Sequence, residues 1–290
     1  MAAEWYDAHI HFFYFYSNNE ILLVLRNLEE KGLAGFDALV DGEIPREIET
    51  IRMMVPGAYH DLITVQVLEH QKDPLAVIKQ ASPLKKIIPF ADARFVRSDA
   101  HQKVQGFKRR GFQGIKLFYV PEDDEELQIG GMKKALGRSV KESEAITALL
   151  IDGASSHGML VLFHADLRKY GDFVEEMVRS HPKTNFNIPH FGSSRKLMSF
   201  LMDRYRNCCT DLSSLSPAMQ RDPASYRDFV TDYQDRILFG SDAVIGRPEE
   251  IESALKFLRK FVDEDEVFDK VVRRNFLRFR HLPEEGPSER

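Results

Sequence analysis

Short apolar segments alternate with longer amphipathic segments along most of the chain. The apolar segments are rich in β-branched and aromatic side chains and have no polar face, which is typical of strands buried on both sides. Nine can be recognised: 6–13, 36–41, 62–68, 86–94, 114–118, 160–164, 185–190, 208–213 and 236–242. Between them the apolar residues repeat with a helical period. The pattern therefore predicts strands and helices in regular alternation.

Helix boundaries are marked by capping and breaking residues. Ser139 and Glu142 form a capping-box pattern, and Gly111 follows a predicted helix where a left-handed residue commonly ends it. The predicted helices are 18–31, 46–54, 74–80, 100–110, 139–156, 172–180, 194–206, 223–233, 248–261 and 264–279. The acidic, glycine-containing stretch 121–138 is predicted to be an exposed loop. A lid, a subunit contact and a solvated insertion are the alternative interpretations of this loop.

This alternation predicts an α/β fold in which helices cover a parallel sheet. A closed (β/α)8 TIM barrel has eight strands, so one candidate must lie outside it, and 36–41 and 62–68 are the uncertain ones. The alternative, a doubly wound open sheet, would carry a glycine-rich turn after its first strand, where this chain has aromatic residues. We predict a single barrel domain over residues 1–282, with room for a small insertion, and a flexible tail at 283–290.

Composition and charge narrow the class of protein. Hydrophobic residues make up 43% and charged residues 29%, with a net charge of −5, so we expect a soluble protein that binds neither nucleic acid nor membranes. No apolar run is long enough to span a membrane, and no signal-peptide pattern is evident. Cys208 and Cys209 are adjacent, which disfavours a disulfide between them. Reduced, buried thiols favour a cytoplasmic location.

Two histidines near the start of the chain are the first candidates for chemistry. In the predicted strand 6–13, His9 and His11 point to the same face because side chains alternate along a strand, and Asp7 lies in line with them. Two imidazoles in this arrangement can bind one divalent cation. A His-x-His pair alone is weak evidence, and a pair of histidines without function at a strand end is the alternative.

Further polar residues lie at or near the carboxyl ends of later strands. They are Lys116, His164, His190 and Asp242, each on a different predicted strand. In a parallel barrel all strand carboxyl ends open on one face, so these side chains would meet His9 and His11 in one cavity. Three imidazole nitrogens and a carboxylate around a cation form a standard catalytic zinc environment, provided that one position stays open for water.

The order of these residues resembles the signature of the amidohydrolase superfamily, in particular its amidohydrolase 2 branch of metal-dependent barrel hydrolases and decarboxylases. The motifs are Asp7-x-His9-x-His11, Gly114-Ile-Lys116-Leu, Leu162-Phe-His164-Ala, Pro189-His190-Phe-Gly192, Leu238-Phe-Gly-Ser-Asp242-Ala and the closing Asn275-Phe-Leu-Arg278-Phe. The resemblance implies a (β/α)8 barrel with His9, His11 and His164 as metal ligands. It also implies that Asp242 is a ligand and takes a proton from metal-bound water, while His190 binds a second metal or polarises the substrate.

Lys116 bears on the number of metal ions. In two-metal members of this superfamily, a lysine on the fourth strand is carboxylated and bridges the ions, whereas a free ammonium offers no electron pair to a cation. The alternative for Lys116 is an ammonium that pairs with Asp242 or with an anionic substrate. One or two ions therefore stay open.

Three further features are candidates for contact with the substrate. Arg94 could hold a substrate carboxylate with its planar fork, or form a structural salt bridge with Asp92 or another acid. Tyr119 could donate a hydrogen bond to the substrate, or pack under the following loop. The aromatic residues 12–16 could wall an apolar pocket, or belong to the core beneath the first helix.

These observations predict a metal-dependent hydrolase of a small molecule, in which metal-bound hydroxide attacks the carbonyl of an amide, lactone or ester. The runner-up is a non-oxidative decarboxylase of an aromatic or unsaturated carboxylic acid, with Arg94 on the carboxylate. The alternative of another class is a non-catalytic barrel that binds a ligand in its cleft. We expect zinc, with manganese as the other metal that suits mixed nitrogen and oxygen ligands. The expected substrate is carboxylated or cyclic, and a homo-oligomer is left open.

Overall fold

The computed structural model describes residues 4–12, 18–43, 45, 47–65, 73–81 and 86–283. Its strands are β1 (Trp5–His11), β2 (Leu33–Asp41), β3 (Lys86–Asp92), β4 (Gly114–Phe118), β5 (Leu160–His164), β6 (Phe186–Ile188), β7 (Cys208–Asp211), β8 (Ile237–Leu238) and β9 (Ala243–Val244). The larger helices are α1 (Asn18–Glu30), α4 (Pro74–Gln80), α5 (Ala100–Arg110), α7 (Val140–Ser156), α8 (Leu167–Ser180), α9 (Arg195–Arg204), α11 (Pro223–Asp232) and α12 (Pro248–Phe261). Strands and helices alternate, as the sequence pattern predicts.

All strands belong to one parallel sheet with the order β8-β7-β6-β5-β4-β3-β2-β1-β9. β8 and β9 lie on one short segment, and β8 pairs with β7 while β9 pairs with β1. The backbone N–H of Ala8 donates to the carbonyl of Phe239 (2.8 Å), and that of Asp242 donates to the carbonyl of His9 (2.9 Å). The sheet therefore closes on itself through a split eighth strand, and the predicted (β/α)8 barrel is confirmed.

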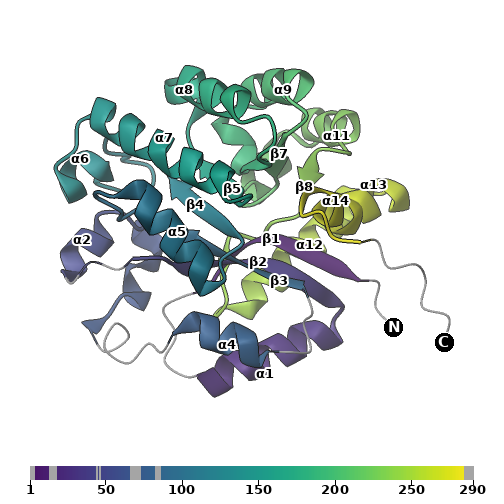
Figure 1. The fold of residues 1–290 in the computed structure, drawn as a ribbon. Coiled ribbons are helices and arrows are strands. Elements are labelled where there is room, and N and C mark those ends of the chain that lie inside the picture. The colour runs from purple at the N-terminus through teal and green to yellow at the C-terminus, as the bar shows by residue number, and fades with distance from the viewer. Residues whose placement is uncertain are drawn as a thin grey trace.

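Helices surround this sheet, as Figure 1 shows for α1 and α4 below it and for α5, α7, α8 and α9 around it. The main apolar core lies between the sheet and these helices. A smaller apolar cluster includes Tyr6, Leu39 and Phe90 from the strands and Phe276 from α14 (Asn275–Phe279). The rings of Tyr6 and Phe276 are stacked at 4.9 Å, so α14 closes the barrel at the end where β1 begins.

The predicted strand 62–68 is wrong over the part that the structure describes. Leu62 ends a 3-10 turn, η1 (Gly57–Leu62), and Val65 is 56% exposed; residues 66–68 lie outside the described residues. β2 already pairs with β1 on one side and with β3 on the other, so the sheet has no free edge there. An apolar run alone does not distinguish a strand from a partly buried loop.

Several helix boundaries differ from those predicted. The helix expected from residue 46 is the short α2 (Ile48–Arg52), and the one expected from residue 172 begins earlier, at Leu167, where the Asp166 side chain accepts from the backbone N–H of Arg168. The predicted loop 121–138 contains a short helix, α6 (Gly131–Leu136). The remaining short elements are η2 (His190–Ser193), α10 (Ser216–Arg221), α13 (Asp265–Asp269) and the π-helix η3 (Lys270–Arg274).

The structure also bears on the predictions about the cysteines, membrane-spanning segments and the carboxyl-terminal tail. Cys208 and Cys209 are free thiols buried in β7, as predicted. Within the described residues, no helix has the length and apolar character needed to cross a membrane. The predicted tail lies almost wholly outside the described residues, which end at Pro283.

Candidate metal centre

A cavity of about 290 Å³ opens at the carboxyl ends of the strands. Among the residues that line it are His11 from β1, Lys116 from β4, His164 from β5, His190 after β6 and Asp242 before β9. These are residues of five different strand ends, far apart in the sequence. The fold thus brings the predicted polar residues to one place.

Three ligand atoms converge beside this cavity, and two of the residues, His11 and Asp242, line it. His9 Nε2 lies 3.0 Å from Asp242 Oδ1, and His11 Nε2 lies 3.0 Å from the same oxygen. One ligand atom from each residue lies within 4.8 Å of the other two, the only such group of three or more found in the described part of the chain. Two imidazole nitrogens and one carboxylate oxygen suit zinc or a related divalent cation.

The backbone around these residues has features that aim the side chains inward. The register of β1 against β2 shifts between Asp7 and Ile10, and such irregularities re-aim side chains next to active sites. Asp242 has a φ of 60° and His190 a φ of 56°, a left-handed conformation that is uncommon for residues other than glycine. Asp7 accepts hydrogen bonds from the backbone N–H groups of His9 (2.9 Å) and Ser241 (3.1 Å). It therefore braces β1 against the split eighth strand.

The surroundings set the charge of each candidate ligand. Burial would raise the pKa of Asp242, but the His9 ring and hydrogen bonds from both histidines hold that pKa well below its usual range. Burial would lower the pKa of His9, but Asp242 and Asp211 outweigh it and raise the pKa to about 9. Burial and the Lys116 ammonium lower the pKa of His11 to about 3. Asp242 is thus an anion and His11 a neutral imidazole, the forms in which each can bind a cation.

The Asp211 carboxylate contacts the ring nitrogen of His9 that faces away from Asp242. His9 Nδ1 lies 3.2 Å from Asp211 Oδ2, which leaves Nε2 facing Asp242. Histidines that bind metals commonly donate their second ring N–H to a carboxylate or carbonyl in this way. The residues present therefore fit a divalent metal.

Comparison with known proteins agrees with the motifs and the fold. Residues 161–279 match the family model Amidohydro_2, described as amidohydrolase. The match begins in β5 and ends with α14, so the chain is similar to amidohydrolases over its carboxyl-terminal part. A comparison with curated protein sequences finds no match.

Solved structures of low sequence identity share the barrel of this chain. A TatD homologue from Escherichia coli K12 is 14% identical with a TM-score of 0.61, and the match covers 98% of this chain and 100% of that one. The phosphotriesterase homology protein from Escherichia coli is 9% identical with a TM-score of 0.57, over 97% and 99% of the two chains. 5-Methylcytosine deaminase from Klebsiella pneumoniae is 14% identical with a TM-score of 0.56, over 90% of this chain and 62% of that one. These similarities show the fold.

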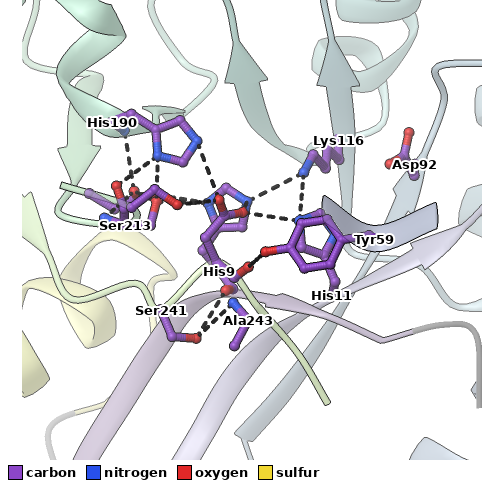
Figure 2. Close-up of polar contacts among 12 residues, drawn as sticks. His9, His11, Tyr59, Asp92, Lys116, His190, Ser213, Ser241 and Ala243 are labelled. Carbon is purple, nitrogen blue, oxygen red and sulfur yellow. Dashed lines mark hydrogen bonds and ion pairs between the residues drawn. The ribbon is translucent and has the colours of Figure 1, made fainter. Parts of the chain in front are cut away.

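Lys116 lies against both histidines of β1. Its Nζ is 3.3 Å from His9 Nε2 and 3.5 Å from His11 Nε2, as Figure 2 shows. Burial and the Arg94 guanidinium lower the pKa of Lys116 to about 8, against the opposite effect of Asp92. An amine in this place is close enough to the three ligand atoms for either predicted role, and its carboxylation stays a prediction.

His164 and His190 lie next to each other and also line the cavity. Their ring centroids are 5.1 Å apart, and His164 also packs against Phe118 at 4.7 Å. His190 Nε2 is 4.0 Å from Asp242 Oδ2, while Nδ1 is 2.8 Å from the carbonyl oxygen of Ser213. Burial and His190 hold the pKa of His164 well below its usual value, so its ring is neutral. Its predicted role as a metal ligand stays a prediction, because it is not part of the group of three.

Arg94 is paired inside the protein. Its Nε and Nη2 donate to Asp92 Oδ2 at 2.9 Å and 2.5 Å, and Nη1 donates to the carbonyl of Met54 at 2.6 Å. Only 4% of Arg94 is exposed, although it lines the cavity. The salt bridge with Asp92, one of the two predicted alternatives, is therefore present, and a contact with the substrate stays a prediction.

The aromatic side chains considered as substrate contacts pack against other side chains of the protein. Tyr119 lines the cavity, but its ring packs against Tyr170 (5.1 Å) and Phe173 (5.2 Å) of α8, which corresponds to the packing alternative. A hydrogen bond from Tyr119 to the substrate stays a prediction. Phe12 is fully buried in the main core, and residues 13–16 lie outside the described residues.

Sequence reasoning missed Asp211 and Ser213. Both are buried at the end of β7 and contact the histidines of the site. The signal was available, because Asp211 is an acidic residue near the carboxyl end of a predicted strand, as Asp242 is. Its direct neighbours are apolar or small, and no motif of the resemblance includes it.

Proposed function

We propose that this protein is a metal-dependent hydrolase of a small molecule, with His9, His11 and Asp242 as metal ligands and His164 as a further ligand. The observation that carries the proposal is the convergence of two imidazole nitrogens and a carboxylate oxygen within 4.8 Å beside the cavity. The match to the amidohydrolase family model supports it. Zinc is the proposed metal, with manganese as the alternative.

A divalent cation at this place would supply an activated water and polarise a carbonyl group. Asp242 is ionised beside it, and its Oδ2 faces the cavity side, where Ser214 Oγ donates to it at 2.7 Å. We propose that Asp242 accepts a proton from the attacking water and passes it to the leaving group. An ionised carboxylate suits the first transfer, and its protonated form suits the second.

His190 and Lys116 would act from opposite sides of Asp242. The carbonyl of Ser213 holds Nδ1 of His190, so its Nε2 points toward Asp242 and the cavity. We propose that His190 polarises the substrate carbonyl, and that Lys116 provides positive charge near the developing oxyanion or, if carboxylated, would help to hold a second metal. The number of metal ions distinguishes the two roles of Lys116.

The cavity itself supports a small substrate. Its volume of about 290 Å³ lies at the lower end of the range for small-molecule sites. Apolar side chains such as Val55, Phe118 and Leu127 line it beside its charged residues. A cyclic or carboxylated amide, lactone or ester fits these walls together with the cationic Lys116. The decarboxylase alternative needs Arg94 on a substrate carboxylate, whereas Arg94 is held by Asp92 and Met54, so we favour the hydrolase.

A metal-reconstitution assay tests this proposal. Metal-free protein would be supplied with zinc or manganese and assayed on a panel of small amides, lactones and esters, with released carbon dioxide measured in parallel. We expect hydrolysis that depends on metal and that falls by roughly 10²–10⁴-fold in Asp242→Asn. The matched control is His101→Ala, which changes an exposed histidine and should leave turnover intact. Carbon dioxide release without hydrolysis would favour the decarboxylase, and equal turnover in Asp242→Asn would contradict the site.

A further inference from the structure

Asp211 is a buried carboxylate behind the candidate metal centre that none of the proposed chemistry uses. It ends β7 and is fully buried. Its Oδ2 is contacted by His9 Nδ1 at 3.2 Å and by Asn187 Nδ2 at 2.9 Å. Its Oδ1 accepts from the backbone N–H groups of Ser213 (3.1 Å) and His190 (3.4 Å), and from the Ser213 hydroxyl. Both oxygens are thus surrounded by donors.

These contacts fix which ring nitrogen of His9 carries a proton. An ionised carboxylate only accepts hydrogen bonds, so the His9 nitrogen that contacts Asp211 must be the N–H. The other groups around Asp211 are donors as well, namely the Asn187 side-chain amide and the backbone N–H groups of Ser213 and His190, which is the environment of an ionised carboxylate. With one proton fixed on Nδ1, Nε2 is the nitrogen that can give up its proton and offer a lone pair to a cation, and it faces Asp242 and Lys116.

The same cluster fixes the tautomer of a second histidine. The Ser213 hydroxyl donates its proton to Asp211 Oδ1. The lone pairs of Ser213 Oγ therefore face the rings of His9 and His190. His190 Nδ1 lies 2.8 Å from the Ser213 carbonyl oxygen and 2.9 Å from Ser213 Oγ, and both can accept its proton. The lone pair of His190 is then on Nε2, which lies 4.0 Å from Asp242 Oδ2.

We propose that Asp211 is a positioning residue that holds His9 directly, and His190 through Ser213, as Nδ1–H tautomers with both Nε2 atoms turned to the metal centre. This inference rests on the proposed function, because it concerns ligands of the proposed metal. It assigns Asp211 no contact with the substrate. Its effect is to keep two imidazoles in the form that can bind a cation or accept a hydrogen bond.

Replacing Asp211 by asparagine tests whether a carboxylate is required at this position. Each oxygen of Asp211 faces at least two donors. In Asp211→Asn, either orientation of the amide places its NH₂ group against donors, so one set of hydrogen bonds is lost whichever way it turns. If the NH₂ faces His9, it favours the opposite tautomer and turns a ring N–H toward the metal.

The first experiment measures zinc affinity by competition with a chelator, for the full-length wild type and Asp211→Asn. We expect zinc binding to weaken by about 10–100-fold in the variant. The matched control is Thr210→Val, the preceding residue of β7, whose buried hydroxyl donates to the carbonyl of Ile188 at 2.5 Å. This hydroxyl also accepts from the backbone N–H of Phe191 (3.2 Å), so the variant loses two buried hydrogen bonds at the same strand and should keep its zinc affinity. Equal zinc affinity in the wild type and folded Asp211→Asn would overturn the inference.

The second experiment reads the tautomers directly, in zinc-loaded wild-type protein labelled with ¹⁵N at histidine. We expect NMR spectra in which His9 and His190 both carry their proton on Nδ1. A proton on Nε2 of His9 would overturn the inference even if Asp211→Asn failed to fold. Wild-type protein that bound no zinc would instead contradict the proposed function, so the two failures are distinguishable.

Discussion

Acidic residues at the strand ends of this barrel differ in charge because their neighbours differ. Asp242 faces two histidines, which hold its pKa well below the usual range. Asp41, at the end of β2, is buried beside Asp92, and both effects raise its pKa to about 7 although Arg94 acts in the opposite direction. An aspartate is therefore an anion at one strand end, and at another it keeps its proton up to about pH 7.

The raised pKa of Asp41 predicts a pH dependence of stability. The folded protein holds a proton at Asp41 that the unfolded chain, with a pKa of 3.8, releases at lower pH. The contribution of Asp41 to stability therefore falls as the pH rises from about 4 to about 7. Asp41→Asn removes this titration. The free energy of unfolding of the variant, relative to that of the wild type, should therefore rise by about 3 kcal/mol between pH 5 and pH 8. Urea unfolding at both pH values measures it, and an unchanged difference between the two proteins would contradict it.

Individual residues of the candidate site were predictable where a motif named them. His9, His11 and Asp242 share a pattern of histidine or acid at a strand end, and the fold places them together. Asp211 has the same position at a strand end but is identified only by its contacts with His9 and Ser213. Arg94 shows the converse, since its sequence position allowed a substrate contact or a salt bridge, and only the structure shows Asp92 against it.

Elements were predictable where local chemistry determines them. Ser139 caps α7 by the predicted capping box, in which its hydroxyl accepts from the backbone N–H of Glu142 and the Glu142 side chain accepts from the N–H of Ser139. The segment 62–68 was not predictable in this way, because pairing is decided by the strands available rather than by the segment itself. The split of the eighth strand into β8 and β9 likewise depends on its two different neighbours.

The capping box gives a prediction for α7. Ser139→Ala removes the side-chain acceptor from the first turn and should lower the free energy of unfolding by about 1 kcal/mol. Ser156→Ala, at the other end of the same helix, removes only a hydroxyl that donates to the carbonyl of Asp152, and should have a smaller effect. Chemical denaturation of both variants measures the difference. Equal effects of the two substitutions would mean that the cap does not stabilise the helix.

At the scale of the whole molecule, the last part of the chain closes the barrel opposite the candidate site. Arg280, just after α14, pairs with Asp37 of β2, and the two side chains are 2% and 0% exposed. The Asn275 side chain donates to the carbonyls of Gln234 (2.6 Å) and Ile237 (2.7 Å) at the start of β8. The closing motif of the sequence therefore has a structural role, in which α14 is fixed to the amino ends of the strands.

Breaking the buried pair should affect stability without affecting chemistry. Arg280→Met leaves the Asp37 carboxylate buried without its partner and should cost about 3–5 kcal/mol of stability. The double variant Asp37→Leu, Arg280→Met removes both charges and should recover a large part of that loss. Thermal and chemical unfolding of the three proteins measures this coupling. A double variant no more stable than the single one would contradict it.

The measurement that tests the central claim most directly is zinc binding by equilibrium dialysis of metal-free protein. We predict that the wild type binds one or two zinc ions per chain. The variant in which His9 and His11 are both replaced by Ala should bind no zinc at the same free zinc concentration. The exposed variant His101→Ala should bind as the wild type does. A wild type that binds no zinc or manganese, or a His9→Ala, His11→Ala protein that binds zinc as tightly as the wild type, would contradict it.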